Sequence, residues 1–334
     1  MPDTRVLVAG GSGYAGALAA RLIDRHPAFE LSAITSRSDV GRPLSQLYPH
    51  YRVDAPLEEL DLDRHCDVEA AIVAYPHGAA APVVAGLRER GVRVVDLSAD
   101  FRLRDRPAYE RWYGEHGAPE LFGSGVYGLP EVYGEQIARA DLVANPGCYP
   151  TATLLGLAPL AAAGSVVDVV IDAKSGVSGA GRAPRAATHF VKVTENVVPY
   201  GVGGHRHMPE IDQELALLGA AVTTTFTPHL LPLDQGELVS CYVTTREPWS
   251  QARVDEAYAI WADGKPFVEI AGAPPGVRDV RDTNICAIWP RADERTGKVF
   301  VFAVIDNIWK GSASQAVQNL NLMYRLPETL GIEP

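Results

Sequence analysis

The sequence predicts an α/β fold in which a doubly wound parallel sheet precedes a second α+β domain with a largely antiparallel sheet. A buried strand pattern at residues 5–9 leads into a glycine-rich turn and then into a helix with one apolar side. Strands at residues 31–35, 70–74 and 92–97 alternate with helical segments, as in a Rossmann-type sheet. After residue 148, longer β-rich stretches separated by Gly- and Pro-rich loops replace this alternation.

The same change of pattern predicts where the domains divide. We expect a first domain over residues 1–147 and a second over residues 148–312. A helix-like run over residues 313–323, apolar at Val317 and Leu320, lies in the C-terminal segment 313–334, which is expected to pack back on the first domain. The β-rich stretches of the second domain lie at residues 166–173, 221–227, 237–245 and 298–305.

Composition and charge exclude several classes of protein. The chain has 334 residues, of which 47% are apolar, and this supports two globular domains. A formal net charge of -11 argues against nucleic acid as a partner, because nucleic-acid binders carry basic faces. No apolar run reaches the length of a membrane span, and residues 1–5 show no signal-peptide pattern. We therefore expect a cytoplasmic protein with a small-molecule substrate.

Four cysteines lie far apart without a C-x-x-C pair, which disfavours both a zinc cluster and a disulfide framework. Cys241 and Cys286 lie in strand-like runs, where cysteine behaves as a small hydrophobic residue. Cys66 precedes a predicted strand and has no activating neighbour beyond His65. Only Cys148 has a setting that suggests chemistry.

The first candidate site is the turn after the first strand. It satisfies G-x-G-x-x-G and has the strand before it and the helix after it that a dinucleotide-binding turn requires. Glycines there let the backbone approach a pyrophosphate at the helix N-terminus. The alternative is a glycine-rich turn that binds nothing. The predicted cofactor-binding residues of this turn are Gly10, Gly11, Ser12, Gly13, Tyr14, Ala15 and Gly16.

The end of the second strand indicates which dinucleotide binds. An NAD site usually has a carboxylate there, whereas this strand is followed by Ser36, Arg37 and Ser38. Hydroxyls and a guanidinium fit a 2′-phosphate, so NADP(H) is preferred over NAD. Asp39 keeps NAD open, because a small shift in register would present its carboxylate to the ribose.

The second candidate site is the stretch Asn145-Pro146-Gly147-Cys148-Tyr149-Pro150. Asn-Pro-Gly specifies a tight turn, and Pro150 suits the first turn of a helix. Cys148 is therefore expected at a helix N-terminus, where unpaired amides and the helix dipole favour a thiolate. Such a thiolate, beside a nicotinamide, can attack an acyl group and hold it as a thioester for hydride transfer.

That chemistry needs an acid/base, and His205 and His207 supply two candidates on a glycine-led loop. A metal pair is the rival interpretation, but a clustered third ligand is missing, and one of the two imidazoles is expected to have only a structural role. His77 follows a sheet strand and is expected to shape the cofactor cleft. Arg102 and Arg182 lie in loops where they suit an anionic substrate, although surface roles remain open for each.

Taken together, these segments resemble the N-acetyl-γ-glutamyl-phosphate reductase family, which is related to aspartate-semialdehyde dehydrogenase. The resemblance runs over nearly the whole chain and is far more specific than any one motif. Besides the glycine turn and residues 36–38, it rests on residues 98–102, 127–131, 143–152, 175–182, 205–207 and 306–311.

The resemblance implies NADPH-dependent reduction of N-acetyl-L-glutamyl 5-phosphate to the 5-semialdehyde with release of phosphate, in arginine biosynthesis. It implies Cys148 as nucleophile and one histidine as acid/base, with His207 favoured narrowly over His205. It also implies an NADP-binding first domain, a catalytic and dimerisation second domain, and a homodimer or homotetramer. The further cofactor-binding residues would be Pro76, His77, Ser178, Gly179, Asn307, Lys310 and Gly311. The substrate-binding residues would be Arg102, Asn145, Ser175 and Arg182, and no metal is implied.

Two alternatives stay open at this stage. The same acyl-phosphate chemistry on a lysine-pathway aminoadipyl carrier protein would need a basic groove for the carrier, which the acidic chain does not indicate. A non-catalytic NADP-sensing regulator would tolerate the loss of Cys148 and would need a partner-binding surface, for which no segment is evident.

Overall fold

The computed structural model describes residues 4–65 and 67–332, so the expectation for Cys66 falls outside the described residues. The chain divides into two compact units. Of the described residues, unit 1 contains those up to Gly147 and residues 312–332, and unit 2 contains Cys148–Gly311. A helix long and apolar enough to cross a membrane does not occur in the described residues.

Unit 1 contains a seven-stranded sheet with the strand order β3-β2-β1-β4-β5-β7-β6, and every pairing in it is parallel. Parallel order follows from the sequence, because each short apolar strand is followed by a segment long enough to cross back. The strands are β1 (Thr4–Ala9), β2 (Phe29–Thr35), β3 (Leu57–Glu58), β4 (Ala70–Val73), β5 (Arg93–Asp96), β6 (Val126–Tyr127) and β7 (Leu142–Ala144).

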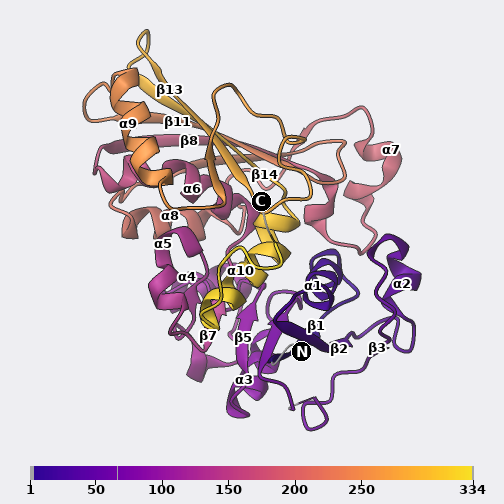
Figure 1. Ribbon diagram of the computed structural model, residues 1–334. Coiled ribbons are helices and arrows are strands. Elements are labelled where there is room, and N and C mark those ends of the chain that lie inside the picture. The colour runs from indigo at the N-terminus through magenta and orange to yellow at the C-terminus, as the bar shows by residue number, and fades with distance from the viewer. Residues whose placement is uncertain (1–3, 66, 333–334) are drawn as a thin grey trace. The chain divides into compact units, whose positions relative to one another are not determined.

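Helices cover both faces of this sheet (Figure 1). On one face α3 packs against a buried cluster that includes Leu7, Ala9 and Val73, and on the other α1 packs beside α10. The side chain of Asn319 on α10 donates to the backbone carbonyl of Gly128, which ties this helix to the unit. The helices of unit 1 are α1 (Tyr14–Asp24), α2 (Leu44–Leu47), α3 (Ala81–Glu89), α4 (Arg106–Tyr113), α5 (Pro130–Ile137) and α10 (Ser314–Met323).

Unit 2 contains a second seven-stranded sheet, with the strand order β12-β13-β14-β11-β8-β10-β9. Its long central pairs are antiparallel, whereas β8 pairs with β10 and β12 with β13 in parallel. The strands are β8 (Val166–Ser175), β9 (Val198–Pro199), β10 (Thr225–Leu230), β11 (Glu237–Thr245), β12 (Val268–Ile270), β13 (Cys286–Asp293) and β14 (Lys298–Ile305).

The helix α6 packs along one face of this second sheet and contacts α8 and α9 as well (Figure 1). It is buried along almost its whole length, as its continuously apolar sequence requires. Alternation along β11 turns Glu237, Val239 and Cys241 toward α6 and leaves Leu238 and Tyr242 half-buried on the other face. The helices of unit 2 are α6 (Cys148–Ala162), α7 (Phe190–Val193), α8 (Met208–Leu217) and α9 (Gln251–Ala262).

The predicted fold class is confirmed: a parallel, Rossmann-type sheet and a largely antiparallel second sheet. Some boundaries differ from the expected ones. The strand expected at residues 221–227 is β10, Thr225–Leu230. Within the C-terminal segment 313–334, the helical run expected at residues 313–323 is α10, Ser314–Met323. The helix stops there because Arg325 takes a positive φ of 56° and Pro327 cannot continue a helical hydrogen-bond ladder.

Candidate active site

The glycine turn of unit 1 is fixed by close approaches of its own backbone. Gly10 has a φ of 94°, and a Cβ there would lie 2.6 Å from the carbonyl oxygen of Ala74. A Cβ on Gly16, in the first turn of α1, would lie 2.4 Å from the carbonyl oxygen of Gly10. Only glycine fits these two positions, so the turn can fold tightly between β1, α1 and the residues that follow β4.

The N-terminus of α1 suits an anion. Gly13 is the N-cap residue and supplies no side-chain cap, and the first turn of the helix contains no acidic residue. A Cβ on Gly13 would find only the Gly10 carbonyl oxygen, 3.8 Å away, so the space beside this residue is open. Uncapped amides with open space next to them fit the pyrophosphate of a dinucleotide.

Three serine hydroxyls gather beside this turn. Ser36, directly after β2, donates to the Ser12 hydroxyl at 2.7 Å, and the Ser38 hydroxyl lies 3.3 Å from the same oxygen. The guanidinium of Arg37 lies over the ring of Tyr75, 5.0 Å from its centroid. Asp39 forms an ion pair with Arg42 at 2.8 Å. The structure therefore brings the residues predicted to bind the ribose next to the glycine turn.

The remaining predicted residues of unit 1 follow β4, β5 and β7. Pro76 and His77 are exposed, and the Nδ1 atom of His77 accepts a hydrogen bond from the backbone N–H of Ala99. Arg102 is buried and donates to the backbone carbonyls of Asn145 at 2.7 Å and Leu97 at 2.8 Å. Asn145 donates in turn to the carbonyl of Ser312 and accepts from Asn319.

In unit 2 the thiol of Cys148 stands at the first residue of α6. It is partly exposed, whereas Cys241 and Cys286 are buried in the core, and burial raises the pKa of Cys241. Gly311 packs directly against Cys148, because a Cβ on Gly311 would lie 2.8 Å from the Cys148 Cβ. The first turn of α6 contains no acidic residue, so its amides and dipole favour a negative charge on the sulfur.

The two candidate histidines pack around the next residue, Tyr149. The ring centroids of His205 and His207 lie 5.7 and 5.9 Å from that of Tyr149, and 4.8 Å from each other. Phe226 on β10 lines the same group of rings, and the Tyr149 hydroxyl hydrogen-bonds that of Tyr200 at 2.9 Å. Both imidazoles are thus placed in unit 2 beside the residue that follows the thiol.

The two imidazoles differ in their environments. The backbone N–H of His207 donates to Nδ1 of His205 at 3.1 Å, so this nitrogen of His205 has no proton. Burial, together with the neighbouring Arg206, lowers the pKa of His205 to about 4. His205 is therefore neutral near pH 7, with its proton on Nε2. His207 is half-buried at the N-cap position of α8.

A second group of predicted residues surrounds the start of β11. The side-chain oxygen of Asn307 accepts from the backbone N–H of Gly236 at 2.7 Å, and its amide nitrogen donates to Ser178 at 3.0 Å. Gly179 lies against Ser175 and Asn307, since a Cβ there would be 3.5 and 3.6 Å from their side chains. Ser175, Ser178, Gly179 and Asn307 therefore come together, whereas Arg182 is exposed in the loop beyond.

Lys310 lies in a short π-helical turn, Trp309–Ala313, that precedes α10. Its side chain is fully buried, and the ammonium group lies 5.5 Å from the centroid of the Phe267 ring. Among the described residues, no group of three or more His, Cys, Asp or Glu side chains is arranged to hold a metal ion.

Three residues of the thiol region were not identified from the sequence as site residues: Tyr149, Tyr200 and Glu237. Glu237 is fully buried and interacts with the Cys148 thiol. One signal was available for it, because the alternating pattern of β11 puts this glutamate on the apolar face of the strand. Tyr200 gave no such signal, since it lies in an irregular loop.

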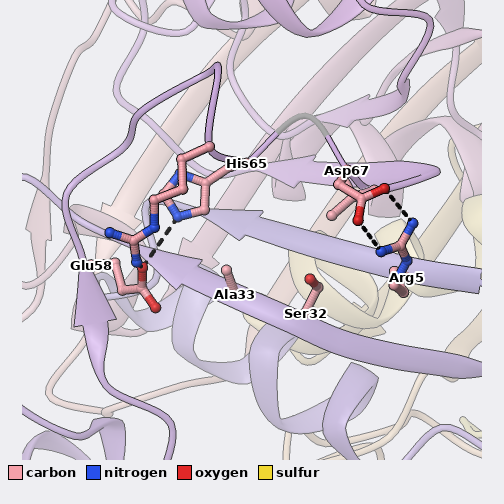
Figure 2. Close-up of a pocket in the computed structure, with 8 residues that line it drawn as sticks. Arg5, Ser32, Ala33, Glu58, His65 and Asp67 are labelled. Carbon is pink, nitrogen blue, oxygen red and sulfur yellow. Dashed lines mark hydrogen bonds and ion pairs between the residues drawn. The ribbon is translucent and has the colours of Figure 1, made fainter.

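A cavity of about 220 Å³ in unit 1 is a separate feature (Figure 2). Its charged groups neutralise one another, because Arg5 pairs with Asp67, and both Arg64 and His65 pair with Glu58. Arg5 lies near the start of β1, whereas the glycine turn follows the end of that strand. The cavity thus extends from the start of β1 to Glu58 at the end of β3, and none of its lining residues belongs to the glycine turn.

Comparison with known proteins assigns the family. Residues 5–140 match the semialdehyde dehydrogenase NAD binding domain, and residues 148–307 match the semialdehyde dehydrogenase dimerisation domain. The N-acetyl-gamma-glutamyl-phosphate reductase of Moorella thermoacetica is 47% identical over 98% of this chain and 97% of its own length. That of Desulforudis audaxviator is 48% identical over the same shares.

The chain belongs to the N-acetyl-gamma-glutamyl-phosphate reductase family. Solved structures of aspartate semialdehyde dehydrogenases have the same fold as this chain. Aspartate semialdehyde dehydrogenase II from Vibrio cholerae, complexed with ASA, superposes with a TM-score of 0.74 at 20% identity, covering 96% of this chain and 98% of the other. Aspartate semialdehyde dehydrogenase with NADP from Candida albicans gives a TM-score of 0.72 at 14% identity over the same shares. At these identities the likeness shows the common fold.

Proposed function

We propose that this protein reduces N-acetyl-L-glutamyl 5-phosphate to N-acetyl-L-glutamate 5-semialdehyde with NADPH and releases phosphate, as a cytoplasmic enzyme of arginine biosynthesis. The observation that carries the proposal is the Cys148 thiol at the first residue of α6, with His205 and His207 packed on Tyr149 beside it. The two relatives described above are named as reductases of this acyl phosphate. In this proposal unit 1 binds the dinucleotide and unit 2 supplies the nucleophile.

The chemistry begins with the Cys148 thiolate, which attacks the acyl carbon. The bond from carbon to sulfur forms, the bond from carbon to the phosphate oxygen breaks, and inorganic phosphate leaves. Backbone N–H groups at the start of α6 are in a position to stabilise the oxyanion of the tetrahedral species. NADPH, when bound, supplies the hydride that reduces the thioester. The resulting thiohemiacetal then releases aldehyde and restores the thiolate.

The acid/base of this proposal is His207. His205 has a pKa lowered by burial to about 4, and its Nδ1 atom accepts the backbone N–H of His207. An imidazole in that state holds the loop in place but does not donate as an imidazolium near pH 7. His207 is therefore assigned the proton transfer at the reacting oxygen, and His205 the positioning of the loop.

Residues of unit 1 support NADP(H) over NAD. The hydroxyls of Ser12, Ser36 and Ser38 form one polar group beside the uncapped helix N-terminus. Arg37 supplies a cation next to this group, while the carboxylate of Asp39 is paired with Arg42. Hydroxyls and a guanidinium suit a 2′-phosphate. The remaining proposed cofactor contacts come from the glycine turn and from further residues of both units. These further residues are Pro76 and His77 of unit 1, and Ser178, Gly179, Asn307, Lys310 and Gly311 of unit 2.

For the substrate we propose Arg102 and Asn145 near the phosphate, together with Ser175 and Arg182. Arg102 donates to two backbone carbonyls, which fix the direction of its guanidinium. Asn145 is locked by hydrogen bonds to Ser312 and Asn319. Such fixed groups suit a substrate that must be held in one orientation.

We also propose a homodimer or homotetramer. The face of the unit 2 sheet turned away from α6 carries half-buried aromatic pairs, Tyr242 with Phe300 and Trp289 with Phe302. This is the region that matches the dimerisation domain. Light scattering on the wild type and on Phe302→Asp tests the proposal: an oligomer that dissociates in the variant supports it, and a wild-type monomer overturns it.

The activity is tested in the reverse direction, with the semialdehyde, phosphate and either NADP⁺ or NAD⁺, by following absorbance of the reduced cofactor. We expect phosphate-dependent reduction of NADP⁺, and no signal from Cys148→Ser. Absence of reduced cofactor with both nucleotides overturns the proposed function. A preference for NAD⁺ overturns only the assignment of Ser36, Arg37 and Ser38.

A further inference from the structure

The first residue of β11, Glu237, places a carboxyl group inside the core of unit 2. Its exposure is 0%, and alternation along the strand puts it on the face that α6 covers, in line with Val239 and Cys241. Its register partners on the neighbouring strands are Ser175 and Ile305. Burying a carboxyl group at a strand position that is otherwise apolar costs free energy, because the group loses its hydration. A glutamate at such a position is therefore a candidate for a functional role.

Few polar groups compensate this burial. Within the described residues, neither carboxyl oxygen of Glu237 has a hydrogen-bond partner by distance and angle. Cys148 lies near the start of β11, because a Cβ on Gly311 would be 2.8 Å from the Cys148 Cβ and 3.2 Å from Cδ1 of Ile305, the register partner of Glu237. The titratable groups that act on the Glu237 carboxyl are the Cys148 thiol from α6, which favours its ionised form, and Asp306 after β14, which disfavours that form. A negative charge on Glu237 also raises the pKa of the hydroxyls of Tyr149 and Tyr200. Lys174 on β8 points to the opposite face of the sheet.

We propose that the carboxylate of Glu237 accepts the proton of the Cys148 thiol. In the state in which the two groups together hold one proton, that proton lies on Glu237 and the negative charge lies on Sγ of Cys148. The inference rests on the proposed function, since it takes Cys148 as the nucleophile. In the step the S–H bond breaks, an O–H bond forms on the carboxylate, and one negative charge moves from oxygen to sulfur. Release of the aldehyde restores the same thiolate, so Glu237 keeps the proton throughout turnover.

Two features place the charge on sulfur rather than on the carboxylate. The amides and dipole at the start of α6 stabilise an anion at Cys148, whereas Asp306 opposes a second anion at Glu237. Burial, aided by Asp306, raises the pKa of Glu237 to about 8, close to that of a thiol, although the thiol itself opposes part of the rise. Proton transfer between groups of matched acidity costs little free energy.

The first experiment measures alkylation of Cys148 by iodoacetamide between pH 6 and pH 9, in the wild type and in Glu237→Gln. A protonated Glu237 donates a strong hydrogen bond to the thiolate, so replacing it with the weaker amide donor should slow alkylation roughly 10-fold near pH 7.5. An ionised Glu237 would repel the thiolate, and its removal would speed alkylation. Faster or unchanged alkylation in the variant overturns the proposal. Glu214→Gln, at another buried acid of unit 2, is the matched control and should react like the wild type.

A second measurement needs only the wild type and serves if Glu237→Gln does not fold. Thiolate absorbance and the infrared band of protonated carboxyl groups are followed together through pH 7 to 9, with Cys148→Ser as the reference for the thiolate. The proposal expects thiolate to appear while the Glu237 carboxyl band persists. Loss of that band before thiolate appears overturns it. Neither readout depends on turnover, so failure here is distinct from failure of the proposed function, which the reductase assay decides.

Discussion

The two candidate sites are built from different materials. The candidate dinucleotide site of unit 1 is shaped mainly by backbone: Gly10 and Gly16 approach main-chain atoms so closely that a Cβ would come within 2.6 and 2.4 Å of a carbonyl oxygen. The thiol site of unit 2 consists of side chains from α6, from the loop at His205 and His207, and from β11. These side chains are distant in sequence and are brought together by the folded sheet and its helices.

The difference predicts how each site fails. Backbone sites fail sterically, so substitutions there change folding and cofactor binding. Side-chain sites fail chemically, because a thiol, an imidazole or a carboxyl group can be replaced by a similar shape that cannot carry the proton or the electron pair. Substitutions at the thiol, imidazole and carboxyl groups of the thiol site should therefore change turnover while leaving the fold and the binding of NADPH intact.

The largest expected effect is that of Cys148→Ser. The hydroxyl has nearly the shape of the thiol but is not ionised at neutral pH, so kcat should fall by at least about 1,000-fold. Steady-state kinetics measures the loss, and fluorescence titration with NADPH should give an unchanged Kd. Cys286→Ser, at a core cysteine on β13, is the matched control and should retain kcat. Retention of turnover by Cys148→Ser would show that no covalent intermediate forms on this residue.

Next comes the contrast between the two histidines. His207→Asn should lower kcat about 100-fold, because general acid/base catalysis is typically worth that much or more. His205→Asn should cost less, since asparagine can still accept the His207 backbone N–H that Nδ1 of His205 accepts. Rapid-quench measurement of phosphate release should show that acylation survives in both variants. A larger loss in His205→Asn than in His207→Asn would reverse the assignment.

The glycine turn offers a matched pair of substitutions. Gly16→Ala places a Cβ 2.4 Å from the Gly10 carbonyl oxygen, and should lower the free energy of unfolding by about 2 kcal/mol. Gly13→Ala meets no atom closer than 3.8 Å, so the fold should be unaffected while the Kd for NADPH rises about 10-fold. Thermal unfolding and NADPH titration separate the two outcomes. Gly134→Ala in α5 is the control, and equal effects of Gly13→Ala on stability and binding would contradict the distinction.

Much of the backbone site could be predicted from sequence because its information is local. The spacing of Gly11, Gly13 and Gly16 reflects steric limits within one turn, and the serines after β2 come at the end of the neighbouring strand. The setting of Cys148 was equally local, since the Asn-Pro-Gly turn and Pro150 indicate a helix start without reference to the rest of the fold. The parallel sheet followed from the same alternation of strand and helix.

The thiol site could be predicted only in part because its remaining contacts depend on register. Tyr149 and Tyr200 are joined by a hydrogen bond between α6 and an irregular loop, which no sequence pattern encodes. Glu237 lies beside Cys148 because β11 pairs with β8 and β14 in one register, and a shift of one residue would turn it to the other face.

The smallest expected effect concerns stability and its pH dependence in unit 2. Burial and Asp306 raise the pKa of Glu237 from 4.5 to about 8, so between these values the folded protein holds a proton that the unfolded chain releases. The free energy of unfolding should therefore fall as pH rises from about 5 to 8, and Glu237→Gln should remove about 2 kcal/mol of that fall. Urea unfolding at pH 5.5 and pH 8 measures the difference. Glu214→Gln should leave the fall unchanged, and an equal fall in the wild type and Glu237→Gln would mean that this carboxyl is ionised in the folded protein.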